Sequence, residues 1–185
     1  MRKIILLFFI FLSFFLNAHE PNYGLYFKSH KYMGAERTAL VLNNNKPFRL
    51  NKEFILSFDM SLRNEFIFGT VFKIISDTQD VISLNFIADE KNNQYPILSI
   101  NDNIYPITNR IELNKWFFVN IRFSAKKDSV LLDYDKIHLA IPFSFKDWRE
   151  VSLYFGVCRH PNFSSAEIPP MNVRDIKIHS NNKLI

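Results

Sequence analysis

Acidic residues are the first place to look for chemistry in this sequence, because glycoside hydrolysis needs two carboxyl groups that face one cleft. On a strand such groups would occupy alternating positions, as in Glu-x-Asp-x-Glu, since alternate side chains share a face. The sequence contains no such triplet. Asp133 and Asp135 share a parity, but no glutamate lies near them, and they are typical of a polar strand end. The sequence therefore predicts no catalytic residues and no enzyme activity.

Two polar turns carry oxygen groups that a calcium ion could use. One contains Asp77 and Asp80, and the other is the run Asn101, Asp102 and Asn103. Neither has the number of charges or the glycine pivot of a dedicated calcium loop, and turn formation by Asx residues is the favoured interpretation. The five histidines have no paired spacing that would suit zinc. We expect no metal site and no cofactor, with calcium as the weaker alternative.

The segment 159–171 is a loop rich in proline, and it is the first candidate binding surface. Arg159 and His160 offer hydrogen-bond donors, Asn162 offers a two-sided amide, and Phe163 offers a flat apolar ring of the kind that stacks on sugars. Binding residues concentrate on loops that a rigid scaffold holds. The alternative is that Phe163 covers the end of the core and that the prolines stiffen the chain.

The second candidate surface is formed by polar side chains that alternate with apolar ones along the expected strands. We expect Asn85, Asn120, Arg122 and Tyr154 to lie on the outside of one exposed sheet, where a ligand could contact them. Trp148, in the loop 142–150, is expected to pack in the core or at its rim, with a binding platform as the alternative.

The alternation that positions these residues is clearest in Trp116 to Tyr134, which predicts two antiparallel strands joined by a polar turn. The inward set in this hairpin is Phe117, Val119, Ile121, Phe123, Val130, Leu132 and Tyr134. The same period of two recurs along most of the chain, and no segment shows convincing helical periodicity. About ten to eleven short strands therefore predict an all-β fold, an antiparallel two-sheet jelly-roll sandwich.

Two segments depart from simple alternation. The run Ile67 to Ile75 is apolar on both parities, which predicts a central strand covered on both sides, with Gly69 at a bulge or a close backbone approach. Arg174 has the inward parity of its strand, so we expect either a bulge near Asp175 or a position for Arg174 at a strand end, where it pairs with an acidic residue across the sheet. The single cysteine, Cys158, is expected to be a small buried residue.

The length and composition favour one secreted domain. The chain has 185 residues, of which 48% are hydrophobic, enough for one core. Residues 1–18 begin with two cations and continue as an apolar stretch, which predicts a signal peptide; an uncleaved anchor is the alternative. Residues 19–185 would then form one domain outside the cytoplasm, secreted, periplasmic or on the cell surface, without stable membrane insertion after cleavage. One cysteine favours a bacterial envelope protein. The charge of +5 shows no basic run, so nucleic-acid binding is not expected.

The order of these segments resembles a laminin-G-like domain of the concanavalin A-like lectin and glucanase superfamily, of the bacterial envelope type. The resemblance covers roughly residues 23–180. The segments that carry it lie between residues 54 and 180 and are FILSFDMSL, FGTVFKII, ISLNF, ILSIND, WFFVNIRFS, VLLDYD, VSLYFGV and MNVRDIKIHS. The resemblance implies a jelly-roll sandwich, and in this family a calcium ion at the rim is common. The catalytic triplet of the glucanase branch is missing from the sequence.

These observations lead to an expected function. We expect a non-catalytic recognition domain that binds carbohydrate on one of the two candidate surfaces, with a glycan or an envelope protein as its partner. The alternative is a structural or protein-interaction module of an envelope or sensor assembly. A glycoside hydrolase is the least favoured of the three, because the required carboxyl groups are missing.

Overall fold

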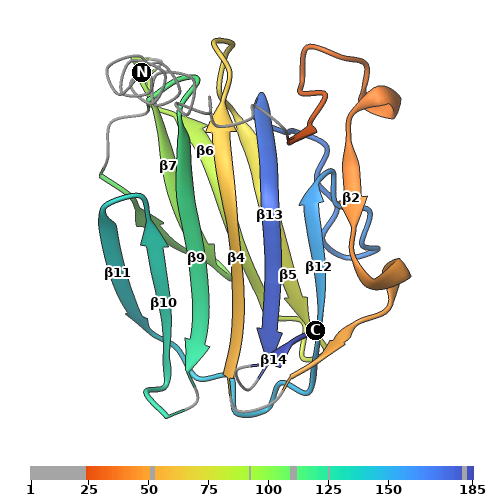
Figure 1. Cartoon of the computed structure of the whole chain (residues 1–185), viewed down its shortest axis with the longest axis vertical. Coiled ribbons are helices and arrows are strands. Elements are labelled where there is room, and N and C mark those ends of the chain that lie inside the picture. Colours follow the sequence, from red (N-terminus) through yellow and green to blue (C-terminus); the bar gives the residue numbers. More distant parts are fainter. Residues whose placement is uncertain (1–23, 51–52, 92, 109–111, 125, 181–182) are drawn as a thin grey trace, which may run out of the picture.

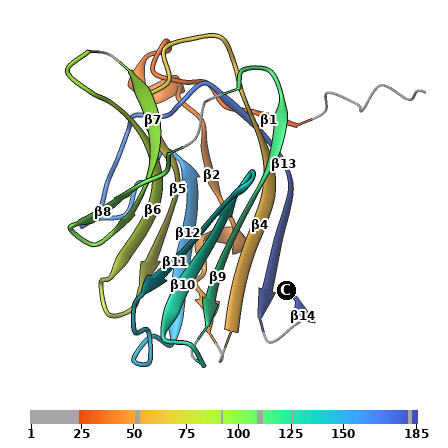
Figure 2. The ribbon, with the colours of Figure 1, turned by 90° about the vertical axis from the view of Figure 1, so that its left-hand side faces the viewer.

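A computed structural model describes the chain from residue 24 to residue 185, except for residues 51–52, 92, 109–111, 125 and 181–182. The predicted signal peptide, residues 1–18, therefore lies outside the described residues, and so do residues 19–23 of the predicted domain. Two antiparallel sheets of seven strands each stack face to face (Figure 1, Figure 2). This arrangement confirms the all-β sandwich that the alternation of the sequence predicted. In the described part of the chain, no helix has the length and apolar character to cross a membrane.

The first sheet, sheet A, has the strand order β1-β13-β4-β9-β10-β11, and β14 pairs with β13. Its strands, in chain order, are β1 (Leu25–Tyr26), β4 (Glu53–Leu62), β9 (Trp116–Ser124), β10 (Ser129–Tyr134), β11 (Ile137–Pro142), β13 (Met171–Ser180) and β14 (Lys183–Leu184). The predicted hairpin is β9 and β10, with Val130 opposite Phe123 and Tyr134 opposite Val119.

The second sheet, sheet B, has the strand order β2-β12-β5-β6-β7-β8, and β3 pairs with β12. Its strands are β2 (Ala39–Val41), β3 (Phe48–Arg49), β5 (Gly69–Ser76), β6 (Val81–Ala88), β7 (Gln94–Ile100), β8 (Asn103–Pro106) and β12 (Glu150–Gly156). Two short 3-10 helices, η1 (Gly34–Glu36) and η2 (Asn43–Asn45), lie in the connections on either side of β2. The apolar run 67–75 supplies β5, which lies between β12 and β6.

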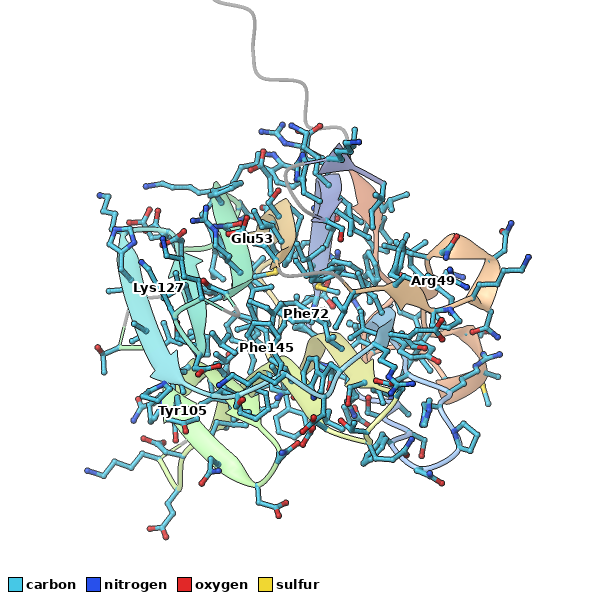
Figure 3. All side chains as sticks on the ribbon, turned by 90° about the horizontal axis from the view of Figure 1, so that it is seen from below. Arg49, Glu53, Phe72, Tyr105, Lys127 and Phe145 are labelled. Carbon is cyan, nitrogen blue, oxygen red and sulfur yellow. The ribbon has the colours of Figure 1, made fainter. Side chains whose placement is uncertain are left out.

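The core fills the space between the sheets with aromatic rings. The largest fully buried side chains are Phe27, Phe54, Phe58, Phe72, Phe86, Phe123 and Phe155. Phe58 of sheet A contacts Phe72 and Phe155 of sheet B edge to face, with ring centroids 5.9 and 5.0 Å apart. Figure 3 shows Phe72 between the two layers, whereas Arg49 and Lys127 lie at the outside. Edge-to-face contacts add to the hydrophobic stabilisation of burial, so these rings fix the sheets against each other.

A bulge in β13 explains the unusual parity of Arg174. The pairing of β13 with β4 shifts between Arg174 and Lys177, and Asp175 has a positive φ of 53°. The extra residue resets the alternation, so that Arg174 faces outward while Ile178 is buried. Arg174 also pairs with Asp59 of β4 at 3.2 Å. The predicted bulge is therefore confirmed, and so is the ion pair across the sheet, although Arg174 lies inside the strand and not at its end.

Gly69 begins β5 in a conformation that other residues rarely adopt. Its φ is +112°, and a Cβ at this position would lie 2.5 Å from the carbonyl oxygen of Glu167 and from the nitrogen of Ile168. The register of β5 against β6 also shifts between Thr70 and Phe72. The close backbone approach predicted at Gly69 is confirmed, and the approaching segment is the loop that follows β12. The bulge offered as the alternative lies between Thr70 and Phe72 and not at Gly69.

Candidate functional site

The four candidate residues expected on one sheet lie on opposite faces of the sandwich. Asn120 and Arg122 belong to β9 of sheet A, whereas Asn85 belongs to β6 and Tyr154 to β12 of sheet B. Each points away from the core, as its parity predicted, but the expectation of a shared face is wrong. The parity of a residue within its strand predicts only whether the side chain faces the core. The sheet to which the strand belongs depends on pairing with strands that are distant in the sequence.

A row of polar side chains crosses the outer face of sheet A. The pairing places Lys177 beside Ser57, Ser57 beside Asn120, Asn120 beside Asp133, and Asp133 beside His138. Neighbouring residues on one face of an antiparallel sheet interact directly. The row therefore brings together groups from five strands, of which sequence reasoning had selected only Asn120 as a binding residue. The register of the predicted hairpin could have shown that Asp133 lies opposite Asn120.

Asp133 is the centre of this row. Its Oδ2 accepts a hydrogen bond from Asn120 Nδ2 at 2.9 Å, and its Oδ1 lies 2.7 Å from His138 Nδ1. Burial alone would raise the pKa of Asp133, but the hydrogen bonds from Asn120 and His138 outweigh it and hold the pKa below its ordinary value. The carboxylate is therefore ionised at neutral pH, and it holds the Asn120 amide and the His138 ring in place.

An open cavity of about 240 Å³ lies over this part of sheet A. It is lined by Asn120, Arg122, Leu131, Asp133, His138, Leu139 and Ala140. The cavity thus has a polar side formed by the Asp133 network and an apolar side formed by Leu131 and Ala140. Ligand sites usually combine an apolar lining with a few fixed polar groups in this way.

Arg122 is the cation of the cavity, and its hydrogen-bonding capacity is largely unused. Its nearest anion in the described chain is Glu53, whose Oε1 lies 3.9 Å from Arg122 Nε. Nε itself is buried and has no hydrogen-bond partner among the described residues. The side chain remains 43% exposed. A guanidinium with free donors beside an open cavity is suited to an oxygen-rich ligand, above all to one that carries a carboxylate.

The outer face of sheet B has a polar cluster of a different kind, centred on Asn85. Thr70 Oγ1 donates to Asn85 Oδ1 at 2.9 Å, and Asn85 Nδ2 donates to Ser83 Oγ at 2.8 Å and lies 3.4 Å from Ser99 Oγ. Thr70 and Ser83 are buried. Here the side chains satisfy one another, which leaves the Asn85 amide little capacity for a ligand.

The loop that follows β12 folds over the outer face of sheet B and covers Tyr154, which is only 7% exposed. Lys73 Nζ of β5 donates to the carbonyl of Phe163 at 3.0 Å, and Asn162 Nδ2 donates to Gln79 Oε1 at 2.9 Å. Burial of the half-covered ammonium lowers the pKa of Lys73. The loop is therefore attached to the sheet through both its backbone and its side chains.

Within this loop the predicted binding residues have mixed environments. Phe163 is half-buried and packs against a small apolar cluster formed by Ile75, Tyr154 and Cys158. Phe163 therefore has the packing contacts that the alternative interpretation expected. Its ring covers the outside of sheet B, however, and not the end of the main core. His160 stacks on Phe163 with centroids 5.5 Å apart, while Arg159 is exposed. Cys158 is buried, as predicted, and burial raises the pKa of its thiol.

Asp80, in the first of the turns considered for calcium, uses both carboxylate oxygens inside the fold. Asp80 accepts hydrogen bonds from Trp148 Nε1 at 2.7 Å, from Asn101 Nδ2 at 2.8 Å and from Thr78 Oγ1 at 2.8 Å. Burial would raise the pKa of Asp80, but these three donors lower it overall. In the described part of the chain, no group of three His, Cys, Asp or Glu residues is arranged to hold a metal ion.

Trp148 is 6% exposed, with its indole against Phe123, Phe143 and Phe145. Figure 3 shows Phe145 near the centre of this end of the molecule. The core role expected for Trp148 is confirmed, and the alternative of a binding platform is wrong. Its N–H donates to Asp80, as a buried indole requires.

No protein-family model matches the sequence, and no curated protein matches it either. Solved structures do match in fold. Domains LG4-5 of the mouse laminin alpha1 chain superpose with a TM-score of 0.55 at 15% identity, covering 88% of this chain and 44% of the laminin chain. A heptameric SAP-like pentraxin from Limulus polyphemus superposes with a TM-score of 0.52 at 11% identity, covering 72% and 66%.

An alginate lyase in complex with an alginate tetrasaccharide matches with a TM-score of 0.50 at 13% identity, covering 78% of this chain and 71% of the lyase. The protein thus spans less than two thirds of the laminin and pentraxin chains. At identities this low, the superpositions show a shared fold and carry no information about activity. The protein has a laminin-G-like, concanavalin A-like sandwich fold.

Proposed function

We propose that the protein is a non-catalytic recognition domain that binds a glycan in the cavity on the outer face of sheet A. The observation that carries the proposal is that the cavity combines a fixed polar network with a cation that is only weakly paired, at 3.9 Å from Glu53. Asp133 holds Asn120 and His138 in place, while Arg122 keeps free donors. Preorganised groups of this kind bind a polar ligand without a large ordering cost.

The lining of the cavity matches the chemistry of a sugar ring. The carboxylate of Asp133 and the amide of Asn120 can exchange hydrogen bonds with neighbouring hydroxyl groups. Leu131 and Ala140 offer apolar surface to the C–H groups of the ring. Arg122 favours a saccharide that carries a carboxylate, because a guanidinium binds that group through two parallel hydrogen bonds. An acidic glycan is therefore the favoured ligand class.

The absence of catalysis is part of the proposal. Asp133 is the one carboxyl group among the residues that line the cavity, and two hydrogen bonds already hold it in its ionised form. Acid and nucleophile of a glycosidase would need a second carboxyl group facing the same space. The apolar segment 1–18, which lies outside the described residues, supports export of the domain to a place where surface glycans occur.

The proposal can be tested by titration calorimetry with acidic and neutral oligosaccharides of matched length. We expect an acidic oligosaccharide to bind the protein and Arg122→Gln to lower its affinity about tenfold or more, because a hydrogen bond to a charged group contributes roughly 1.5–3 kcal/mol. Arg159→Gln is the matched control, since Arg159 is exposed on the loop over sheet B. Binding that depends on Arg159 and not on Arg122 would move the site to the other face. No binding to any glycan would contradict the proposal.

A protein-binding role is the second candidate, and it depends on a different feature. Phe66 and Phe68, which precede β5, are 46% and 36% exposed, and their rings lie 6.4 Å apart at 25°. His30 contacts Phe66 edge to face at 5.7 Å. Exposed aromatic groups of this kind are enriched where proteins contact each other. Loss of a copurifying protein partner in the double variant Phe66→Ser, Phe68→Ser would favour this function.

A further inference from the structure

Strand β11 forms the last strand of sheet A and leaves one edge of that sheet uncovered. Among the described strands it pairs with β10 alone, and Figure 1 shows it at the left margin of the molecule with no strand beyond it. The other edge strands are shorter: β1 has two residues, β2 has three, and the four residues of β8 end in Pro106.

The sequence of β11, IHLAIP, has none of the features that usually protect an edge. Native sheets protect long edges with lysines, prolines or inward-pointing charges, because an open edge is a template for another strand. Its six residues include no lysine, arginine, aspartate or glutamate, and its proline stands at the very end. An edge of this length without protection suits a strand from another molecule.

The direction of the free backbone groups follows from the hydrogen bonds at both ends of the hairpin. Asp135 N donates to Phe118 O of β9 at 3.0 Å, and Phe143 N donates to Asp128 O at 2.9 Å. Backbone groups alternate in direction along a strand. Therefore Ile137, Leu139 and Ile141 direct their N–H and C=O groups toward β10. His138 and Ala140 direct theirs toward the open side.

We propose that β11 pairs with β11 of a second copy of this chain, antiparallel and about a two-fold axis that passes beside Leu139. In the extended sheet, the core-facing side chains of one subunit must lie beside core-facing side chains of the partner subunit. A slip of one residue would break this match, so only registers that differ by two residues are allowed. When Leu139 lies opposite Leu139 of the partner subunit, His138 lies opposite Ala140 of the partner subunit. By the same symmetry, Ala140 lies opposite His138 of the partner subunit. These pairs exchange four N–H···O hydrogen bonds, and no like charges face each other.

The neighbouring registers that preserve parity are weaker. Centring the axis on Ala140 would place His138 opposite Pro142 of the partner subunit, which has no N–H to donate. Centring it on His138 would place Ala140 opposite Lys136 of the partner subunit, which lies in the turn before the strand. The register centred on Leu139 is therefore the one that pairs both the N–H and the C=O groups of His138 and Ala140 with residues of the partner's strand.

The pairing would bring two cavities together. His138, Leu139 and Ala140 line the cavity of sheet A and also form the new junction. Each cavity would border the edge strand of the partner subunit, so that one extended sheet would present two cavities side by side. The dimer itself does not depend on glycan binding. A monomer that binds glycans would contradict only this inference, and a dimer that binds none would contradict only the proposed function.

A disulfide across the two-fold axis tests the register. Leu139→Cys places two sulfurs at directly opposite positions that exchange no hydrogen bonds, where Cα atoms lie about 4.5 Å apart, within reach of a disulfide. Ala140→Cys is the matched control, because its two copies lie on a diagonal roughly 7–8 Å apart. We expect oxidation to link the first variant into a covalent dimer, at a rate at least tenfold higher than the second. Equal rates would overturn the register.

Sedimentation equilibrium tests the dimer without a cysteine. We expect the unmodified protein to show a dimer that grows with concentration, and Ala140→Pro to abolish it. The proline removes a donor of the open edge but none of the bonds to β10. Ala140→Val keeps the donor and is expected to keep the dimer. A protein that stays monomeric at its highest soluble concentration, or a dimer that survives Ala140→Pro, would overturn the proposal.

Discussion

The two outer faces of the sandwich use similar side chains for different purposes. On sheet A, Asn120 belongs to a network that borders an open cavity, and Arg122 beside it keeps unused donors. On sheet B, Asn85 lies among hydroxyl groups that satisfy it, and a loop covers the neighbouring Tyr154. An outward polar residue on a strand therefore identifies a candidate ligand contact only when its hydrogen-bonding groups remain available.

The difference between the faces comes from what lies above each sheet. The loop after β12 packs its Phe163 ring and its backbone onto sheet B, and Gly69 lets it approach closely. The described loops make no comparable hydrogen bond across the middle of β9 and β10 on sheet A. The predictions that follow test whether the sheet B surface is structural and the sheet A surface is functional.

The largest effect is expected at Gly69. Gly69→Ala combines a φ of +112° with a Cβ that would overlap the backbone of Glu167 and Ile168. We expect it to lower the free energy of unfolding by on the order of 3 kcal/mol, measured by urea denaturation. Gly34→Ala is the control, because nothing lies within 4 Å of a Cβ there. If Gly69→Ala left the free energy of unfolding unchanged, the loop after β12 would not depend on the close approach at Gly69.

Asn120→Asp should have the next largest effect. It places a second carboxylate beside Asp133, where Asn120 Nδ2 now donates a hydrogen bond at 2.9 Å. Repulsion between the two is expected to cost on the order of 2 kcal/mol of stability at pH 7 and less near pH 4, where one of them is protonated. Glycan affinity should fall about tenfold or more.

Asn85→Asp is the matched substitution on the other face. It removes the donor to Ser83 and should cost about 1 kcal/mol of stability, while glycan affinity stays unchanged. Urea denaturation and calorimetry on both variants give the comparison directly. Equal losses of affinity in the two variants would mean that the faces do not differ in function.

Phe163→Ala is expected to act on stability and not on binding. The ring packs against Ile75, Tyr154 and Cys158, and its loss should cost about 1 kcal/mol. Glycan affinity should remain within error, and Arg159→Ala, at an exposed site on the same loop, should change neither quantity. An affinity loss in Phe163→Ala with unchanged stability would instead support the loop as the binding surface.

The smallest effect concerns the pH dependence of stability. The pKa of Asp133 is lowered in the folded protein, so the ionised carboxylate stabilises the folded state. This stabilisation is fully present above the unfolded pKa of about 3.9 and is lost as the pH falls through the folded pKa. Denaturation from pH 7 to pH 3 should therefore show a steeper acid loss for the unmodified protein than for Asp133→Asn. A steeper loss in the variant would mean that the folded pKa of Asp133 is raised.

Local patterns predicted the fold well, because burial imposes a period of two that is visible within eight or ten residues. The β9–β10 hairpin, the central position of β5, the special role of Gly69 and the bulge beside Arg174 all followed from such patterns. The candidate site followed only in part. Asn120 and Arg122 were selected as outward residues, but His138 was missed because the contribution of β11 depends on its pairing with β10.

The grouping of residues by face could not be predicted from alternation. Asn85 and Asn120 have the same local pattern, and only pairing between distant strands assigns them to different sheets. Likewise, nothing near Tyr154 in the sequence shows that the loop after its own strand turns back to cover it. Such long-range contacts decide which polar groups remain available for a ligand.

The burial of Cys158 gives the protein an internal reporter. Its thiol lies under the loop after β12, beside Tyr154 and Phe163, and only 1% of the residue is exposed. A thiol-specific reagent can therefore reach the sulfur only when the loop detaches or the domain unfolds. Because the chain contains one cysteine, the labelling rate of the unmodified protein measures how often sheet B loses its cover.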